Sequence, residues 1–104
     1  MVKHLTRICF VSLLVAGTVC YAQSGADTYK AKCQMCHGAD GTGDTPAGKS
    51  TKVRSFSSAD VKKMSDDDLI KVTTNGHNKM PAYKGKLTDA QIKDVVAYIH
   101  TLQK

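Results

Sequence analysis

The chain has 104 residues, a length that predicts a single domain. Its 15 Lys and Arg residues against nine acidic residues give a formal charge of +6 at pH 7. The positive residues are spread along the chain, which argues against a nucleic-acid-binding stripe. The excess is consistent with plain solubility, and it also favours weak steering toward acidic protein surfaces.

The first 22 residues have the pattern of a secretory signal peptide. A basic start with Lys3 and Arg7 precedes an uncharged run over 8–20, which is too short to cross a bilayer as a helix. We expect cleavage after Ala22, so that residues 1–22 are the signal and residues 23–104 form an exported, periplasmic domain that does not span the membrane. An uncleaved anchor helix is the alternative.

The chain that remains after cleavage is small for a self-sufficient hydrophobic core. It contains Phe56 and three Tyr residues, and the sequence has no Trp. Domains this small and this poor in aromatic residues usually need a disulfide, a metal or a cofactor. Because Cys9 and Cys20 leave with the signal, only Cys33 and Cys36 remain for such a role.

Signals at helix ends predict three helices in the mature chain. The first runs over 24–36, the second follows Ser65 and ends near residue 75, and the third follows Thr88 and reaches the C-terminus. Residues 58–63 add a short helical turn. The sequence shows no alternating strand pattern, so the fold class is all-α with three to four helices.

Two long loops separate these helices, over 38–57 and 75–86. Both are rich in Gly and contain Pro, which is typical of irregular structure. Loops this long are unusual in so small a domain unless they wrap around something that fills the space.

The segment Cys33-Gln34-Met35-Cys36-His37 is an attachment sequence for c-type haem. Residues three and four positions apart share one face of a helix. Cys33 and Cys36 are therefore placed to form thioethers at one porphyrin edge, while the ring of His37 falls under the iron. This pattern predicts one covalently bound haem c, with His37 as an iron ligand.

Three other interpretations compete for the same motif. A zinc site would combine Cys33, Cys36 and His37 with His77 or His100. A plain disulfide would leave the small core unexplained. A redox Cys-x-x-Cys belongs beside a βαβ unit, which the sequence does not predict.

The sixth position of the iron has several candidate ligands. Met80 lies in the second loop and is followed by Pro81, which restricts Met80 to an extended backbone and keeps it out of a helix. We expect Met80 to be the ligand, with His77 or an open site as the alternatives. The remaining candidates are less suited to reach the iron: Met35, Met64 and His100.

These residues together resemble the class I cytochrome c family in its small bacterial single-haem form. The resemblance covers nearly all of 25–102, and the segment 75–83 looks like the family's Met-ligand loop. Gly25 and Tyr29 keep the spacing by which the family's first helix crosses its last helix, near Val95 and Tyr98.

The resemblance implies further roles for individual residues. The Pro46 carbonyl would accept a hydrogen bond from the second ring nitrogen of His37, which would make Pro46 part of the cofactor site. A haem propionate would be bound by one of three residues: Lys49, Arg54 or Tyr83.

The family resemblance also implies the function. The fold would be cytochrome c-like, with helices and loops wrapped around the haem. The protein would be a monomeric electron carrier and not an enzyme, working between acidic redox partners such as an oxidase, a reductase or a dehydrogenase, with no role for nucleic acid. Two alternatives stay open: a haem subunit of a larger oxidoreductase, and a haem enzyme or gas sensor with an open iron site.

Overall fold

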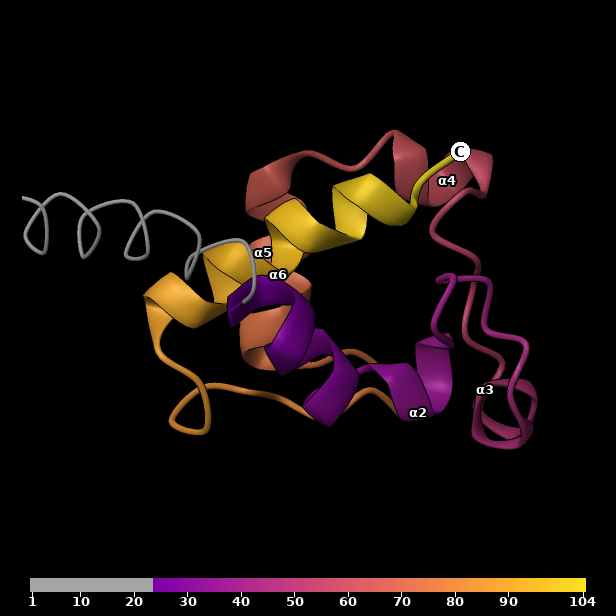
Figure 1. Ribbon diagram of the computed structural model, residues 1–104, viewed down its shortest axis with the longest axis horizontal. Coiled ribbons are helices and arrows are strands. Elements are labelled where there is room, and N and C mark those ends of the chain that lie inside the picture. The colour runs from indigo at the N-terminus through magenta and orange to yellow at the C-terminus, as the bar shows by residue number, and fades with distance from the viewer. Residues whose placement is uncertain (1–23) are drawn as a thin grey trace, which may run out of the picture.

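The computed structural model describes residues 24–104 (Figure 1). The expected signal peptide over 1–22 lies outside the described residues. Residues 24–32 are helical, and a turn at Cys33 leads into the first labelled helix. The labelled helices follow in chain order: α2 (Gln34–His37), α3 (Pro46–Thr51), α4 (Ala59–Lys62), α5 (Asp66–Asn75) and α6 (Asp89–Leu102).

The predicted all-α class is confirmed. No strand is present within residues 24–104, which hold only two isolated β-bridges, one of them between His77 and Met80. The two longest labelled helices, α5 and α6, pack against each other, and the short helices α2 and α3 form a second pair.

The caps of the two main helices are those that the sequence predicts. The hydroxyl oxygen of Ser65 accepts a hydrogen bond from the amide of Asp68 at the start of α5. Thr88 and Gln91 form a complete capping box at the start of α6, with each side chain bonded to the other residue's amide. Such caps satisfy backbone donors that the first helical turn leaves unpaired.

Helix α3 corrects the prediction that residues 38–57 are irregular throughout. Thr45 caps this helix by accepting a hydrogen bond from the amide of Gly48 at 2.8 Å. Pro46 occupies the first helical position, where its missing amide hydrogen costs nothing. The helix ends before Lys52, the C-cap residue, whose backbone is left-handed with a φ of 58°. The described residues therefore contain more helical segments than the three or four expected.

The first helical segment crosses α6, as predicted from Gly25 and Tyr29 (Figure 1). A Cβ atom on Gly25 would lie only 2.6 Å from the carbonyl oxygen of Asp94, so only glycine allows this approach. Next to the crossing, the rings of Tyr29 and Tyr98 lie 5.2 Å apart. The crossing fixes the segment that leads directly into the cysteine motif.

The buried core joins all parts of the fold. Its residues come from the first helical segment, the 53–64 region, α5 and α6: Tyr29, Cys33, Phe56, Val61, Leu69, Val95, Val96 and Ile99. One cysteine of the motif is thus part of the core itself.

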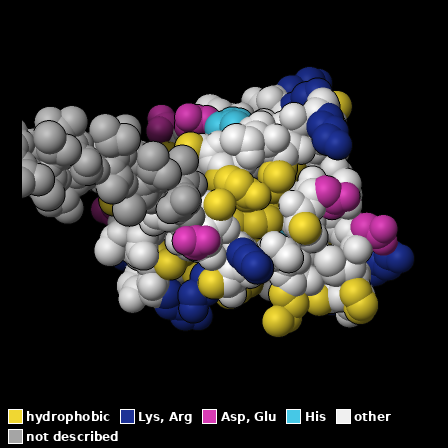
Figure 2. All heavy atoms as spheres, viewed as in Figure 1, with side chains coloured by type: hydrophobic (Ala, Val, Ile, Leu, Met, Phe, Trp, Pro, Cys, Tyr) yellow, Lys and Arg dark blue, Asp and Glu magenta, His cyan; other side chains and the backbone are white. Residues whose placement is uncertain are grey.

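The surface carries both signs of charge. Figure 2 shows Lys and Arg side chains interspersed with Asp side chains over the viewed face, with no single positive stripe. Among residues 24–104, no helix combines the length and the apolar character that crossing a bilayer would need.

Candidate haem-binding site

A cavity of about 580 Å³ lies between the cysteine motif and the loop that follows α5. Its size is within the range of pockets that bind small molecules and cofactors, about 300–1,000 Å³. Three motif residues line it: Cys33, Cys36 and His37. Apolar side chains from the buried core form much of the rest of its wall, among them Phe56 and Ile99.

The two cysteines reach this cavity as free thiols. Cys33 is buried and Cys36 is partly buried. Burial raises the pKa of the Cys33 thiol to about 11, with the nearby Cys36 as a lesser cause. The disulfide interpretation is therefore not supported by the structure. The zinc interpretation is not supported either, because no three His, Cys or Asp side chains within residues 24–104 come together as a metal-binding group.

His37 lies partly buried at the wall of the cavity. Burial lowers the pKa of its imidazole, which favours the neutral form that binds metals. The ring stacks on Phe56, with the ring centres 4.6 Å apart and the planes 18° apart. The ring is thus held in one plane before any metal is bound.

The hydrogen bond expected between His37 and Pro46 is not formed. The Nδ1 atom of His37 is buried and has no hydrogen-bond partner within residues 24–104. Pro46 is the first residue of α3, and a carbonyl at that position points along the helix toward the amide four residues later. The role of Pro46 is instead to start α3.

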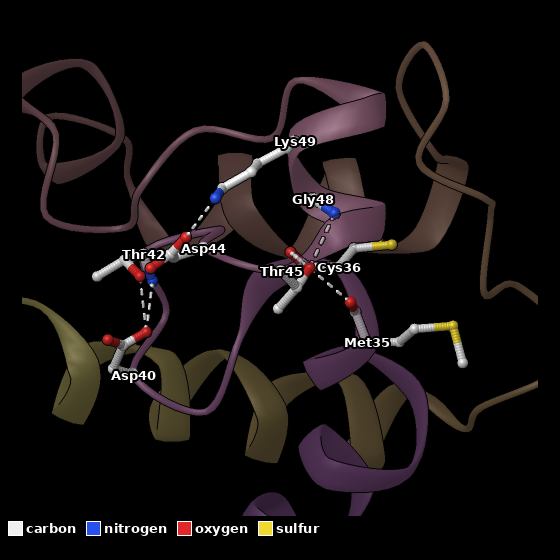
Figure 3. Close-up of polar contacts among 8 residues, drawn as sticks. All are labelled: Met35, Cys36, Asp40, Thr42, Asp44, Thr45, Gly48 and Lys49. Atoms are coloured by element: carbon white, nitrogen blue, oxygen red, sulfur yellow. Dashed lines mark hydrogen bonds and ion pairs between the residues drawn. The ribbon is translucent and has the colours of Figure 1, made fainter.

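Thr45 connects the motif to α3 (Figure 3). Its hydroxyl donates to the carbonyl oxygens of Met35 at 2.8 Å and Cys36 at 3.1 Å, while its oxygen accepts from the amide of Gly48. These carbonyls lie in the last turn of a helix, where no amide of the same helix can reach them. One side chain therefore completes the end of α2 and the start of α3.

Two candidate sixth ligands, His77 and Met80, sit on one tight turn and both line the cavity. The amide of His77 donates to the carbonyl of Met80 at 3.1 Å, and the amide of Met80 donates back at 2.9 Å. Residues paired in this way place their side chains on the same face of the turn. Met80 is partly buried, whereas His77 is exposed.

The other candidates for the sixth position differ in where they lie. Met64 also lines the cavity. Met35 is 79% exposed and points away from the core. His100 does not line the cavity, and both of its ring nitrogens are engaged, with Asp66 and Gln103.

The charged side chains that line the cavity are all basic: Lys32, Lys52, Arg54 and Lys79. Among the three expected propionate partners, Arg54 and Tyr83 line the cavity and Lys49 does not. Lys49 pairs with Asp44 at 3.1 Å, and the hydroxyl of Tyr83 donates to the backbone carbonyl of Lys32. Arg54 also forms an ion pair, with Asp60 at 3.6 Å, and it is the one basic side chain among these three candidates that lines the cavity.

Two residues of the site, Phe56 and Thr45, were not predicted from the sequence. A Thr-Pro pair is a typical helix start, so Thr45-Pro46 was the available signal for α3. Phe56 lies 19 positions after His37 and carries no local signal, although it is the single Phe of the described residues.

The chain is similar in sequence to several known proteins. The sequence family described as cytochrome c oxidase, cbb3-type, subunit III matches residues 21–99. Cytochrome c6 of Thermostichus vulcanus is 33% identical over 95% of this chain and 91% of its own length. Cytochrome c6 of Nostoc sp. strain PCC 7120 is 40% identical over 73% of this chain and 66% of its own length.

The same similarity appears among solved structures. The KustC0563 c-type cytochrome superposes with a TM-score of 0.71 at 32% identity, covering 77% of this chain and 98% of that one.

Proposed function

The chain belongs to the c-type cytochrome family and is an electron carrier with covalently bound haem c, and we propose that His37 and Met80 are the ligands of the haem iron. One observation carries this proposal: Cys33, Cys36, His37 and Met80, which are far apart in two segments of the sequence, line the same cavity. When bound, the haem supplies a reversible one-electron change of its iron.

The residues of the motif have separate tasks in this proposal. Cys33 and Cys36 hold the cofactor by thioether bonds at one edge. Burial lowers the pKa of His37, which favours the neutral ring that binds a metal.

Met80 is favoured over His77 by its position on the shared turn. Both side chains lie on one face of that turn, but Met80 is the more buried of the two. Gly76 keeps the turn close to the end of α5, since a Cβ atom there would lie 2.8 Å from the carbonyl oxygen of Met80. If His37 and Met80 both hold the iron, they would leave no position for a substrate, which would suit outer-sphere electron transfer.

The basic side chains at the cavity support two further parts of the proposal. Arg54 and Lys52 would pair with the haem propionates. Lys32 and Lys79 would remain for contact with a partner, so we propose acidic redox proteins such as an oxidase, a reductase or a dehydrogenase. Such contacts should be small and short-lived, with the carrier acting as a monomer.

We also propose that the protein is exported. Residues 1–22 would be the signal and residues 23–104 the cytochrome c domain, working in the periplasm or an equivalent compartment. Amino-terminal sequencing of the secreted protein tests this part, with Gln23 expected as the first residue.

The ligand proposal is tested by comparing Met80→Ala with His77→Ala in the haem-loaded protein. Ferric iron with a sulfur ligand shows a weak band in the far red, so Met80→Ala should abolish that band and lower the reduction potential on the order of 0.1 V, because axial ligands tune haem potentials over a wide range. His77→Ala should change neither. If His77→Ala lowers the potential and Met80→Ala does not, His77 is the ligand. If neither variant changes the band or the potential, the iron has another ligand or an open site.

A further inference from the structure

Phe56 is placed to control the orientation of the His37 ring. We propose that Phe56 is a positioning residue that sets the plane of this axial imidazole by stacking on it. This inference rests on the proposed ligation by His37 and goes beyond it, since it names the side chain that decides how the ligand is turned.

Few contacts within the described residues fix the orientation of the His37 ring. A histidine that binds a metal almost always donates its other ring N–H to a carbonyl, a carboxylate or water, and this bond fixes the plane of the ring. Here Nδ1 is buried without a hydrogen-bond partner among the described residues. The rotation of an imidazole about its Cβ–Cγ bond has only a broad intrinsic preference, so other contacts must fix it.

The stacked contact with Phe56 meets this need. The two ring centres are 4.6 Å apart and the planes are 18° apart, so a rotation of the imidazole would drive its edge into the face of the phenyl ring. Phe56 itself is only 7% exposed, and it also lines the cavity. The stacking is therefore made inside the site, where the haem would lie.

Phe56 in turn contacts Gly41 through both its ring and its backbone. A Cβ atom on Gly41 would lie 2.6 Å from Cδ2 of the Phe56 ring, so the backbone at Gly41 is already in contact with that ring. The amide of Phe56 donates to the carbonyl of Gly41 at 2.9 Å. Because its backbone and its ring are both constrained, Phe56 can hold His37 instead of moving with it.

Tyr29 completes the support of both rings. Its ring lies 6.3 Å from that of Phe56 at an angle of 59°. Its hydroxyl donates to the carbonyl of Gly38, the residue after His37, at 2.6 Å. The backbone of the ligand and the ring that orients it are thus tied to the same buried tyrosine.

The test compares Phe56→Leu with Phe56→Tyr in the haem-loaded ferric protein. The unpaired spin of low-spin ferric iron spreads over the porphyrin according to the planes of the axial ligands, so the NMR shifts of the four haem methyl groups report the orientation of His37. Phe56→Leu should change the order or the spread of these shifts. Phe56→Tyr keeps a stacked ring and should therefore retain the wild-type pattern.

Ile92→Val is the matched control for core damage. Ile92 is 1% exposed and does not line the cavity, so its truncation should lower stability and leave the methyl pattern unchanged. If Phe56→Leu fails to retain haem, Phe56→Met supplies a flexible side chain without a ring for the same comparison.

The proposal would be overturned if Phe56→Leu or Phe56→Met left the methyl pattern unchanged. It would also be overturned if Phe56→Tyr changed the pattern as much as the variant without a ring. Failure of the proposed function looks different. If His37 is not a ligand, the His37→Ala variant would keep the low-spin spectrum of the wild type.

Discussion

The Thr45 hydroxyl donates a hydrogen bond to the Met35 carbonyl at 2.8 Å, across ten positions of sequence. The same oxygen accepts from the amide of Gly48, so one side chain bonds the end of the haem-attachment helix and the start of α3. This places α3 directly behind the motif, where a Cβ atom on Gly48 would collide with the carbonyl oxygen of Cys36.

Thr45→Val should therefore lower the free energy of unfolding of the haem-loaded protein by about 1–2 kcal/mol, because the change removes a helix cap and leaves carbonyl groups of α2 without their donor. Denaturant unfolding followed by circular dichroism measures this loss. Thr45→Ser keeps the hydroxyl and should lose much less. A loss in Thr45→Ser as large as that in Thr45→Val would contradict the prediction, because Thr45→Ser keeps the hydroxyl that makes these hydrogen bonds and removes only the methyl group.

The attachment of haem by Cys33 and Cys36 gives a second prediction. Thioether bonds survive boiling in detergent and reductant, whereas axial bonds to iron do not. Wild-type protein made with a haem-attachment system should keep haem stain at its own position on a denaturing gel, and Cys33→Ala/Cys36→Ala should lose it. Haem that leaves the wild-type chain and runs at the gel front would contradict covalent attachment.

Gly76 and Gly85 form a matched pair for testing the Met80 loop. Both have a positive φ, 77° and 80°, so alanine at either position is strained in its backbone. Only at Gly76 does the added Cβ meet the loop backbone, at 2.8 Å from the Met80 carbonyl and 2.9 Å from the Ala82 amide, while Gly85 faces open space.

Gly76→Ala should therefore weaken or abolish the far-red band of the ferric protein, whereas Gly85→Ala should only lower stability. The band is read from the absorption spectrum, and stability from thermal unfolding. A normal band in Gly76→Ala would show that the iron ligand does not depend on the contact between Gly76 and the Met80 backbone.

His100 connects the end of α6 to the start of α5 and should make stability depend on pH. Its ring nitrogens lie 2.9 Å from Gln103 Oε1 and 2.5 Å from Asp66 Oδ1, and hydrogen bonds to these two oxygens raise the pKa of His100. Both nitrogens donate only when the ring is protonated. The pKa of His100 is higher in the folded state than in the unfolded state. The stability that protonated His100 contributes is therefore complete below the unfolded pKa of about 6.5, and it is lost as pH rises through the folded pKa.

The expected loss is small, about 0.2–1 kcal/mol, because the pair is largely exposed to solvent. Urea unfolding at about pH 5 and about pH 8, on either side of the unfolded pKa, should show this decrease in the wild type and a smaller one in Asp66→Asn. Asp67→Asn is the control, since Asp67 shares the first turn of α5 without bonding to His100. An identical pH dependence in all three proteins would exclude His100–Asp66 as its source.

The parts of the fold that follow from the sequence are those set by local contacts. Ser65 and Thr88 predict the starts of α5 and α6 correctly because a cap and its partner are three residues apart. The spacing of Cys33, Cys36 and His37 likewise places all three at the cavity, since one helical turn brings them to one face.

The parts that could not be predicted depend on the path of the 38–57 loop. Its glycines indicate irregular structure, yet Gly48 lies inside α3, where the close approach of Cys36 excludes any side chain. The stacking of Phe56 on His37 results from the same path and has no local signal. The expected bond from His37 to Pro46 is not formed among the described residues, where the loop becomes helical at Pro46.

The cavity leads to a final prediction, that the chain without haem is largely unfolded. Apolar side chains of the core, among them Val61, Leu69 and Val95, line the cavity and would have few apolar neighbours without an occupant. A typical domain is stable by only about 5–15 kcal/mol, so the loss of apolar contacts over so many core residues is a large fraction of that stability.

Haem binding should therefore supply most of the folding free energy, as expected for a ligand that binds only the folded chain. The haem-free Cys33→Ala/Cys36→Ala protein should give a poorly dispersed amide NMR spectrum, and the haem-loaded wild type a well-dispersed one. Sharp, dispersed amide signals in the haem-free chain would show that the helices pack without the cofactor. The first segment and α6 are the elements that would then persist, because the contact of Gly25 with Asp94 and the tilted ring contact of Tyr29 with Tyr98 lie outside the cavity.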